Sequence, residues 1–299
     1  MSVDPLAEIV TLLQPAARYS KLVECAGSWR VRREATGEPF YCAILEGRCR
    51  VTLGTQPPLI LQAGDFVLAP AMSDLVNESI DPPAAQTHMM PTRLGEGHFR
   101  IGPHDAPANL RMRIGHCSFG AQDSALLVSL LPDVVVVRDR PRLATLMQLV
   151  DEESREHRPA RELVLERLLE VLLIEALRSG TETGSTPGLS RGLGDERLAI
   201  ALHAMHASPE RFWTVADLAA EASMSRSAFF ARFNRIVGLP PMAYLLAWRM
   251  ALAKRFLRSQ NLGVEQVAER VGYGSASTFS VAFARYAGIP PARYARTPD

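Results

Sequence analysis

The spacing of apolar and polar side chains changes along the chain from helical to strand-like and back to helical. Apolar positions in residues 4–14 fit one face of a short helix. Runs rich in β-branched and aromatic residues follow, and FYCAIL and RCRVTL flank a predicted turn at Glu46 and Gly47. The predicted strands cover residues 29–33, 40–53, 59–61, 66–69 and 134–137. Short, evenly spaced strands of this kind predict a small barrel or jelly roll.

Two amphipathic helices are predicted after the strands, over residues 141–157 and 161–178. The second carries Leu, Val and Ala on more than one side and therefore needs cover from more than one direction. Packing within one chain is one explanation, and a dimerisation face is the one we favour. Residues 179–194 are mostly Gly, Ser, Thr and Pro, which predicts a flexible linker.

The stretch WTVADLAAEASMSRSAFFARF, residues 213–233, predicts a helix, a tight turn and a second helix. Thr214 and Ser225 are good N-caps. Phe229 and Phe233 lie four residues apart and share one face of the second helix. Two helices in series also occur as a hairpin that merely packs, so this stretch alone does not settle whether it contacts DNA.

A second copy strengthens the prediction of a DNA reader. Residues 264–283 repeat the same order, with Phe279 and Phe283 each 50 positions after an aromatic of the first copy. Gly and Pro residues follow the second helix of each copy at matching positions and end it. A linking helix over about 241–260, with Met242, Leu245, Leu246, Met250, Ala253 and Leu257 inward, is ~30 Å long, which is close to one ~34 Å turn of B-DNA.

Charge divides the chain near the same place as the pattern. Residues 1–193 hold 20 Lys+Arg and 24 Asp+Glu, whereas residues 194–299 hold 13 and 8. Because the basic part carries the repeat, phosphate contact is favoured over an ordinary solvated face. The length, the absence of a long apolar run and an N-terminus without a signal pattern predict a cytoplasmic protein of about two domains without a membrane span.

Cysteines and histidines give little support to metal chemistry. Cys25, Cys42, Cys49 and Cys117 match no disulfide or metal spacing and are expected to be buried free thiols. Residues 81–109 are rich in Pro and Gly and predict one or two long loops at the barrel mouth. The spacings of His88, His98, His104 and His116 fit no standard ligand pattern, so we expect them on the surface or in loops.

Two segments carry a family resemblance. PFYCAILEGRCRVTL followed by LQAGDFVLAPAMSDLV resembles the cupin domain at the N-terminus of AraC/XylS-type transcription regulators. RSAFFARFNRIVGLPPMAYLLAWRM and VAERVGYGSASTFSVAFARYAGIPPARY resemble the DNA-binding domain of the same family. The resemblance implies a regulator that dimerises through the helix pair. Residues 41–43 and Leu75 stand where metal-binding cupins have histidines, so we expect no metal and no cofactor.

The predicted fold class is α+β with two domains. A cupin-like regulatory and dimerisation domain covers residues 1–178, a flexible linker 179–194, and an all-α AraC-type DNA-binding domain with two helix-turn-helix motifs 195–299. The expected partners are double-stranded promoter or operator DNA, a second copy of the chain and a small organic effector held in the barrel, with RNA polymerase as a further candidate. No residue is assigned to effector binding.

The predicted DNA-binding residues face outward on the second helix of each motif. In the family, Arg is common at the positions of Ala231 and Val281; neither residue can donate to a guanine edge, so they are expected to meet thymine methyl groups or to leave water. Arg235, Arg249, Arg285 and Arg293 are expected to contact phosphates or solvent. The full set is Arg226, Ser227, Phe230, Ala231, Arg232, Arg235, Ser275, Ser277, Thr278, Ser280, Val281 and Arg285.

Two other functions stay open at this point. One is a cupin-type metal-dependent enzyme with an accessory DNA-binding domain, although no catalytic motif supports it. The other is a regulator whose barrel only dimerises. Metal analysis of the purified protein separates the first from a regulator.

Overall fold

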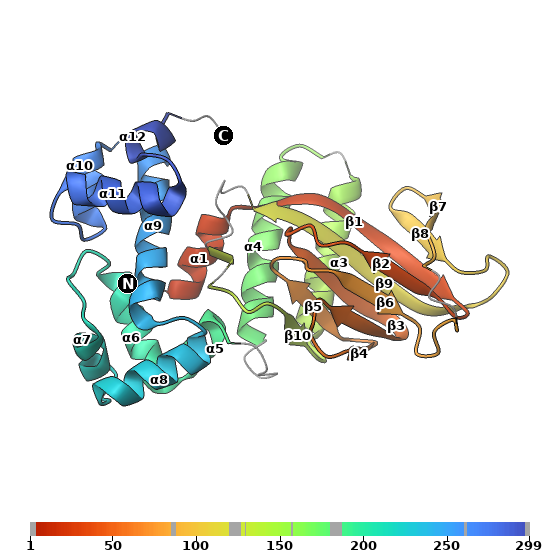
Figure 1. Ribbon diagram of the computed structural model, residues 1–299. Helices are drawn as coiled ribbons and strands as arrows, with labels where there is room; N and C mark the ends of the chain where they lie inside the picture. Colours follow the sequence, from red (N-terminus) through yellow and green to blue (C-terminus); the bar gives the residue numbers. More distant parts are fainter. Residues whose placement is uncertain are drawn as a thin grey trace. The chain divides into compact units, whose positions relative to one another are not determined.

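The computed structural model describes residues 4–84, 88–119, 127–128, 130–156, 158–179, 187–259 and 262–296. These residues form two compact units, which are described separately below (Figure 1). The sheet unit comprises the described residues of 14–120 and 132–186. The helical unit comprises those of 1–13, 121–131 and 187–299.

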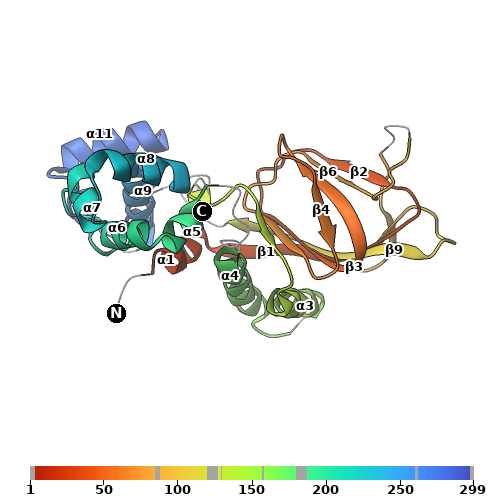
Figure 2. The ribbon, with the colours of Figure 1, turned by 90° about the horizontal axis from the view of Figure 1, so that it is seen from below.

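A curled sheet forms the framework of the sheet unit. Its strand order is β10-β5-β3-β9-β1-β8-β7, with β2, β4 and β6 paired off this path. β3 and β1 each pair antiparallel with β9, while β8 joins β1 in parallel. Figure 2 shows β2, β4 and β6 lying opposite β1 and β9. The strands are β1 (Pro15–Ala26), β2 (Arg30–Arg33), β3 (Phe40–Leu53), β4 (Leu59–Gln62), β5 (Phe66–Ala69), β6 (Leu75–Glu78), β7 (Thr92–Gly95), β8 (His98–Ile101), β9 (Ala108–Phe119) and β10 (Val135–Val137).

The predicted turn at Glu46 and Gly47 is wrong, because β3 continues through both residues. The pairing of β3 with β9 has an irregularity between Ile44 and Glu46 instead. Gly47 has φ +79°, and a Cβ there would lie 2.1 Å from the carbonyl oxygen of Asn109. The glycine therefore marks a close approach of two paired strands rather than a chain reversal.

The long loop predicted over residues 81–109 is also partly wrong. It contains the hairpin β7–β8, in which Arg93 pairs with Phe99. Every residue of β7 is exposed, so the strand lacks the apolar alternation on which a sequence prediction depends. The strand predicted at 134–137 is confirmed as β10.

Side chains of alternate strand residues fill the interior of the curled sheet. Phe40, Cys42 and Ile44 of β3 point into the same buried cluster as Trp29 and Met112. All four cysteines are buried and free, as predicted, and burial raises the pKa of the Cys49 and Cys117 thiols to about 12. Their thiols are therefore protonated near neutral pH and act as small apolar side chains.

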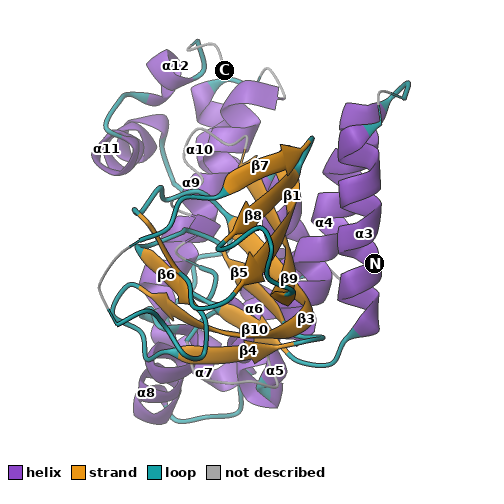
Figure 3. Cartoon of the chain, turned by 90° about the vertical axis from the view of Figure 1, so that its right-hand side faces the viewer, coloured by secondary structure: helices purple, strands orange, loops and turns teal. Residues whose placement is uncertain are grey.

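The helix pair α3 (Pro141–Arg155) and α4 (Arg161–Ser179) confirms the two predicted amphipathic helices. Both helices contact β1 and each other, and Figure 3 shows them side by side along one side of the sheet. Asp151 of α3 is buried against the sheet and accepts a hydrogen bond from the Ser20 hydroxyl at 3.2 Å. It also pairs with Arg113 of β9 and Arg155, so one carboxylate ties the helix to two strands.

The helical unit begins with α1 (Pro5–Leu13), which packs on α6. Glu8 Oε2 lies 2.9 Å from His206 Nδ1, and the Tyr244 hydroxyl lies 2.7 Å from Nε2. Burial lowers the pKa of His206, against the pull of Glu8. A neutral ring that donates from Nδ1 to Glu8 and accepts from Tyr244 satisfies both contacts. These contacts explain why α1 belongs to this unit although the sequence groups it with residues 1–178.

The other helices of this unit are α5 (Leu189–Gly194), α6 (Glu196–Ala207), α7 (Val215–Glu221), α8 (Arg226–Val237), α9 (Pro241–Ser259), α10 (Val264–Arg270), α11 (Ala276–Ala287) and α12 (Pro291–Tyr294). α5 occupies part of the predicted flexible linker because Leu189 is buried there and its amide donates to Leu130. Residues 180–186 of that linker lie outside the described part of the chain. The domain boundaries themselves stay a prediction.

Two side chains of α9 differ from the prediction. Met242 and Leu246, expected inward, are more than a third exposed, whereas Leu245, Met250 and Leu257 are buried. Among the described residues no single helix is long and apolar enough to cross a membrane; α8 and α9 meet that test together, by length and composition only, across a 56° bend.

Candidate nucleic-acid interface

The first helix-turn-helix motif is fixed at both helix starts by side-chain caps. Thr214 and Asp217 form a reciprocal capping box at the start of α7. Ser225 accepts a hydrogen bond from the Ala228 amide at 3.3 Å and begins α8. Between them Ser223 has φ +52°, which lets the chain reverse and the Met224 amide donate to Ala219 O. The predicted N-caps are confirmed.

The second motif repeats this construction with a longer turn. Ser275 caps α11 by accepting from the Thr278 amide at 3.2 Å, 50 positions after Ser225. At the ends of the first helices, however, the Met224 amide donates to Ala219 O and the Tyr273 amide donates to Ala268 O. These matching bonds are 49 positions apart. The extra residue is Gly274, so the 50-residue offset begins at the caps of the second helices and continues through their C-caps, Gly238 and Gly288.

Aromatic pairs hold both second helices on their buried side. Phe229 and Phe233 are fully buried with ring centroids 5.5 Å apart, and Phe279 and Phe283 repeat that distance. Phe233 meets Tyr244 edge to face at 5.8 Å, whereas Phe283 meets Tyr294 at 5.4 Å. Because these faces are buried, the opposite faces of α8 and α11 are turned to solvent.

The exposed faces carry the residues predicted to contact DNA. Four pairs are related by 50 positions: Ser227 and Ser277, Phe230 and Ser280, Ala231 and Val281, and Arg235 and Arg285. Of the twelve predicted residues ten are exposed, while Arg232 and Ser280 are half-buried. Val281 is 70% exposed and Phe230 43%, so the exposed faces present apolar as well as polar side chains.

Several predicted side chains are already engaged within the chain. Arg232 pairs with Asp195, the N-cap of α6, through Nε at 2.8 Å and a terminal nitrogen at 2.6 Å. Ser280 donates to the Ala276 carbonyl at 2.7 Å. The Ser275 and Thr278 hydroxyls lie 2.9 Å apart at the start of α11. These contacts hold the helices in place, and no local sequence signal announces the Asp195–Arg232 pair.

Arg249, expected at phosphates or in solvent, has an internal structural role. Its guanidinium donates to the carbonyl oxygens of Pro209 and Arg211 at 2.7 and 2.8 Å. It also lies beside Gly272, where a Cβ would be 2.7 Å from one of its nitrogens. Arg249 therefore joins the segment before α7 to the turn of the second motif.

Among the histidines of the sheet unit, His88 and His104 are exposed in loops, as predicted, whereas His98 is partly buried in β8. The prediction is wrong for His116. That residue lies in β9 and is buried, and burial together with Lys21 and Arg33 lowers its pKa to about 4. Within the described residues, no three His, Cys, Asp or Glu side chains are grouped so that they could hold a metal ion. The cavity inside the curled sheet measures about 20 Å³.

The comparisons with known proteins bear on the whole chain. The family described as Cupin matches residues 4–182, and the family described as Helix-turn-helix domain matches residues 218–297. A putative AraC-like transcription regulator of Streptomyces lividans is 36% identical, and the alignment covers 99% of each chain. The chain belongs to the AraC family of transcription regulators. The fold agrees, with a curled cupin sheet and its helices followed by a helical region with two helix-turn-helix motifs.

Another AraC-family relative, a putative AraC-like transcription regulator of Streptomyces antibioticus, is 33% identical over 99% of each chain. Both relatives are transcription regulators and not enzymes, so the enzyme alternative is set aside. A solved DNA-binding domain of AdpA in complex with a target DNA is 33% identical, covers 34% of this chain and 90% of that chain, and has a TM-score of 0.32. As an AraC-family member, the chain is a DNA-binding transcription regulator.

Proposed function

We propose that this regulator binds its operator as a homodimer, with α8 and α11 of each chain in successive major grooves, and that its cupin domain responds to a small organic effector. The observation that carries the proposal is the repeat of solvent-turned faces on α8 and α11. The connecting helix α9 has 19 residues, or ~28 Å, close to the ~34 Å between major grooves on one side of B-DNA.

Base reading is assigned to the exposed residues without a capping role. Ser227 and Ser277 offer hydroxyls that can donate or accept at a base edge, and Ala231 and Val281 offer methyl groups suited to thymine. Arg226, Arg235 and Arg285 are exposed at the first or last turns of the two helices. They are assigned to phosphates, which position the protein without reading sequence.

Dimerisation is assigned to the outer surface of the helix pair. Leu149 of α3 and Leu163, Val164 and Val171 of α4 are 38% to 53% exposed. Val164 and Val171 are seven residues apart and share one face of α4. A second copy of the chain can cover these side chains by packing the same surface against itself. This dimer would act in the cytoplasm, and RNA polymerase is its further candidate partner.

The experiment that tests DNA reading is a salt-dependent anisotropy titration against DNA from upstream of the protein's own and neighbouring genes. Tight, sequence-selective binding with a steep salt slope is expected. Ser277→Ala should change which bases are preferred at one position. Arg235→Gln should weaken binding to all sequences and reduce the salt slope by about 0.9.

Arg48→Gln serves as the matched control, because Arg48 is an exposed arginine of β3 in the sheet unit and lies outside the proposed dimer face. It should leave both quantities unchanged. Unaltered binding after both Ser277→Ala and Arg235→Gln would contradict the assignment of α8 and α11 to the grooves.

A further inference from the structure

A groove on the outside of the curled sheet is far larger than the cavity within it. The groove has a volume of about 430 Å³ and lies between the strands β1, β7 and β8 and the adjoining ends of α3 and α4. That volume falls in the range of small-molecule sites. The interior cavity, at about 20 Å³, has room for one water molecule.

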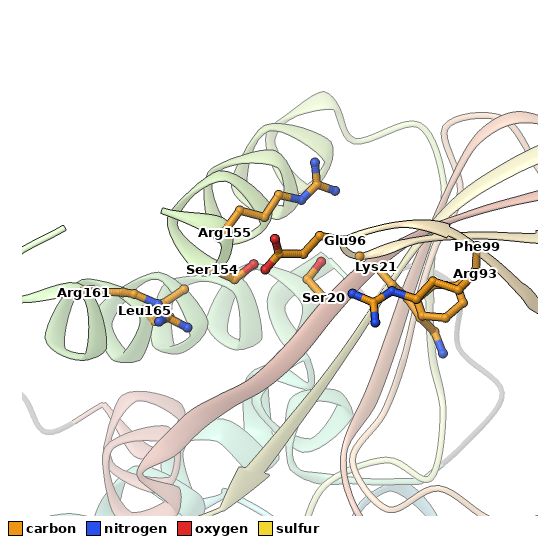
Figure 4. A pocket seen from close by; sticks show the side chains of 10 residues that line it. Ser20, Lys21, Arg93, Glu96, Phe99, Ser154, Arg155, Arg161 and Leu165 are labelled. Carbon is orange, nitrogen blue, oxygen red and sulfur yellow. The ribbon is translucent and has the colours of Figure 1, made fainter. Parts of the chain in front are cut away.

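Positive charge dominates the lining of this groove. Lys21 and Arg93 come from the strands, whereas Arg155 and Arg161 come from the helices, and Glu96 is the one carboxylate among the described residues that line it. Figure 4 shows Lys21 and Arg93 on the strand side and Arg161 on the helix across from them. Because the Lys21 side chain is turned towards the sheet interior, the three arginines and Glu96 set the charge of the groove, and this excess of cations favours an anionic occupant.

The cations are held in place to different degrees. Arg155 is bound to the buried carboxylate of Asp151 at 3.0 Å, and its guanidinium lies beside Gly97 of the β7–β8 turn. Within the described part of the chain, Nε of Arg161 is buried without a hydrogen-bond partner. An unmade bond from a buried guanidinium nitrogen costs free energy that an incoming acceptor would recover.

Lys21 and Phe99 lie between the groove and the interior cavity, because both residues line each of them. Lys21 is 8% exposed, and its ammonium lies 5.5 Å from the centre of the Phe99 ring. Burial, with help from Arg33 of the interior cavity, lowers the pKa of Lys21 to about 8. Phe99 and Leu165 give the groove apolar walls, which suit a ligand with an apolar body.

We infer that the effector of this regulator is an organic monocarboxylate bound in the groove between the β7–β8 hairpin and the α3–α4 pair, outside the sheet interior. Glu96 disfavours a doubly charged ligand, because its carboxylate would repel the second charge. The inference rests on the proposal that the cupin domain responds to an effector, and it names the site and the chemical class.

The test is a ligand-observed NMR titration of the full chain with sodium benzoate, using benzamide as a neutral molecule of the same shape. Benzoate should bind at one site per chain and at least about tenfold more tightly than benzamide. Arg161→Gln and Arg93→Gln should each weaken benzoate binding about threefold or more, because each removes one charge from the lining. Circular dichroism confirms that the variants fold.

Two controls locate the site. Arg48→Gln removes an exposed arginine of β3 outside the groove, and Asn77→Leu changes a buried residue that lines the interior cavity. Both should bind benzoate like the unchanged chain. Benzamide binding as tightly as benzoate, the loss of binding in Asn77→Leu alone, or no benzoate binding at all would overturn the inference.

The DNA titration on the same protein keeps the two proposals apart. Selective DNA binding without benzoate binding would refute the groove and leave the regulator. Benzoate binding that depends on Arg161 without selective DNA binding would support the groove and refute the proposed DNA reading.

Discussion

Arg232 either contacts DNA or stabilises the fold through its ion pair with Asp195, and a double-mutant cycle separates these two roles. The Asp195 side chain is 8% exposed and also accepts hydrogen bonds from the amides of Arg197 and Leu198 at 3.2 Å. Arg232 is 42% exposed, so solvent screens the ion pair and its contribution should be about 0.5–1 kcal/mol. The helix cap should add about 1 kcal/mol.

Three substitutions isolate these contributions. Asp195→Asn keeps a capping side chain and removes the charge, Asp195→Ala removes both, and Arg232→Gln removes the partner. We expect losses of about 0.5–1 kcal/mol for Asp195→Asn and about 1.5–2 kcal/mol for Asp195→Ala. The cycle of Asp195→Asn with Arg232→Gln should give a coupling of about 0.5–1 kcal/mol.

The assay is urea unfolding followed by tryptophan fluorescence. In a Trp29→Phe background the two remaining tryptophans, Trp213 and Trp248, both lie in the helical unit, so the signal reports that unit alone. Although burial acts in the opposite direction, Arg232 and the two amides lower the pKa of Asp195. The coupling should therefore be present above about pH 4 and disappear as the pH falls through the lowered pKa.

The same variants are then titrated with operator DNA. If Arg232 serves the fold, Arg232→Gln lowers the free energy of unfolding and leaves base preference unchanged. A coupling of zero, together with a changed base preference in Arg232→Gln, would refute this reasoning and support a direct contact of Arg232 with DNA.

Four further predictions follow from the geometry. Val281→Arg places a guanidinium on the exposed face of α11 and should favour guanine at one operator position by about 1–3 kcal/mol; unchanged preference in a selection from randomised operators would contradict this. Gly272→Ala should destabilise the helical unit by about 1–3 kcal/mol, because φ is +77° and the new Cβ would lie 2.6 Å from Glu210 O. Gly274→Ala is the control and should leave the stability unchanged, because the space around Gly274 is open. Burial lowers the pKa of His206, so this histidine binds a proton more readily in the unfolded chain than in the folded one. The free energy of unfolding should therefore fall as the pH drops below about 6.5, and His206→Gln should flatten that part of the pH profile. Val171→Glu should shift sedimentation equilibrium towards the monomer, unlike Arg48→Gln in the exposed part of β3, and an unchanged mass would exclude this face from the dimer.

The helix-turn-helix motifs could be predicted because their signals are local. A capping serine, an aromatic four residues after another and a glycine after the last turn each act within one or two turns of helix. The 50-residue repeat placed both second helices correctly. The longer turn of the second motif was missed because Gly272 and Gly274 look alike in sequence, although only Gly272 has a positive φ.

The sheet unit was harder to predict for the opposite reason. β1 mixes Lys21 and Glu24 with small residues, and its character as a strand depends on pairing with β9, about ninety positions away. The charged Lys21 side chain is buried, whereas the apolar Leu22 side chain is less buried. This order is the reverse of the pattern, apolar inward and polar outward, from which strands are predicted. The groove joins residues from five elements and has no sequence motif. Its cations look like ordinary surface arginines until the strands bring them together.

The attachment of α1 to α6 has a consequence for how this chain is made and cut. Glu8 meets His206 across 198 positions, so α1 leaves the ribosome before α6, the helix on which it docks, has been synthesised. The helical unit therefore includes a segment that is translated before the sheet unit. A C-terminal fragment that starts after the linker keeps both recognition helices and loses the partner of His206. We expect such a fragment to be less stable than the same unit in the full chain, and a bulky N-terminal tag to disturb DNA binding from the opposite end of the sequence.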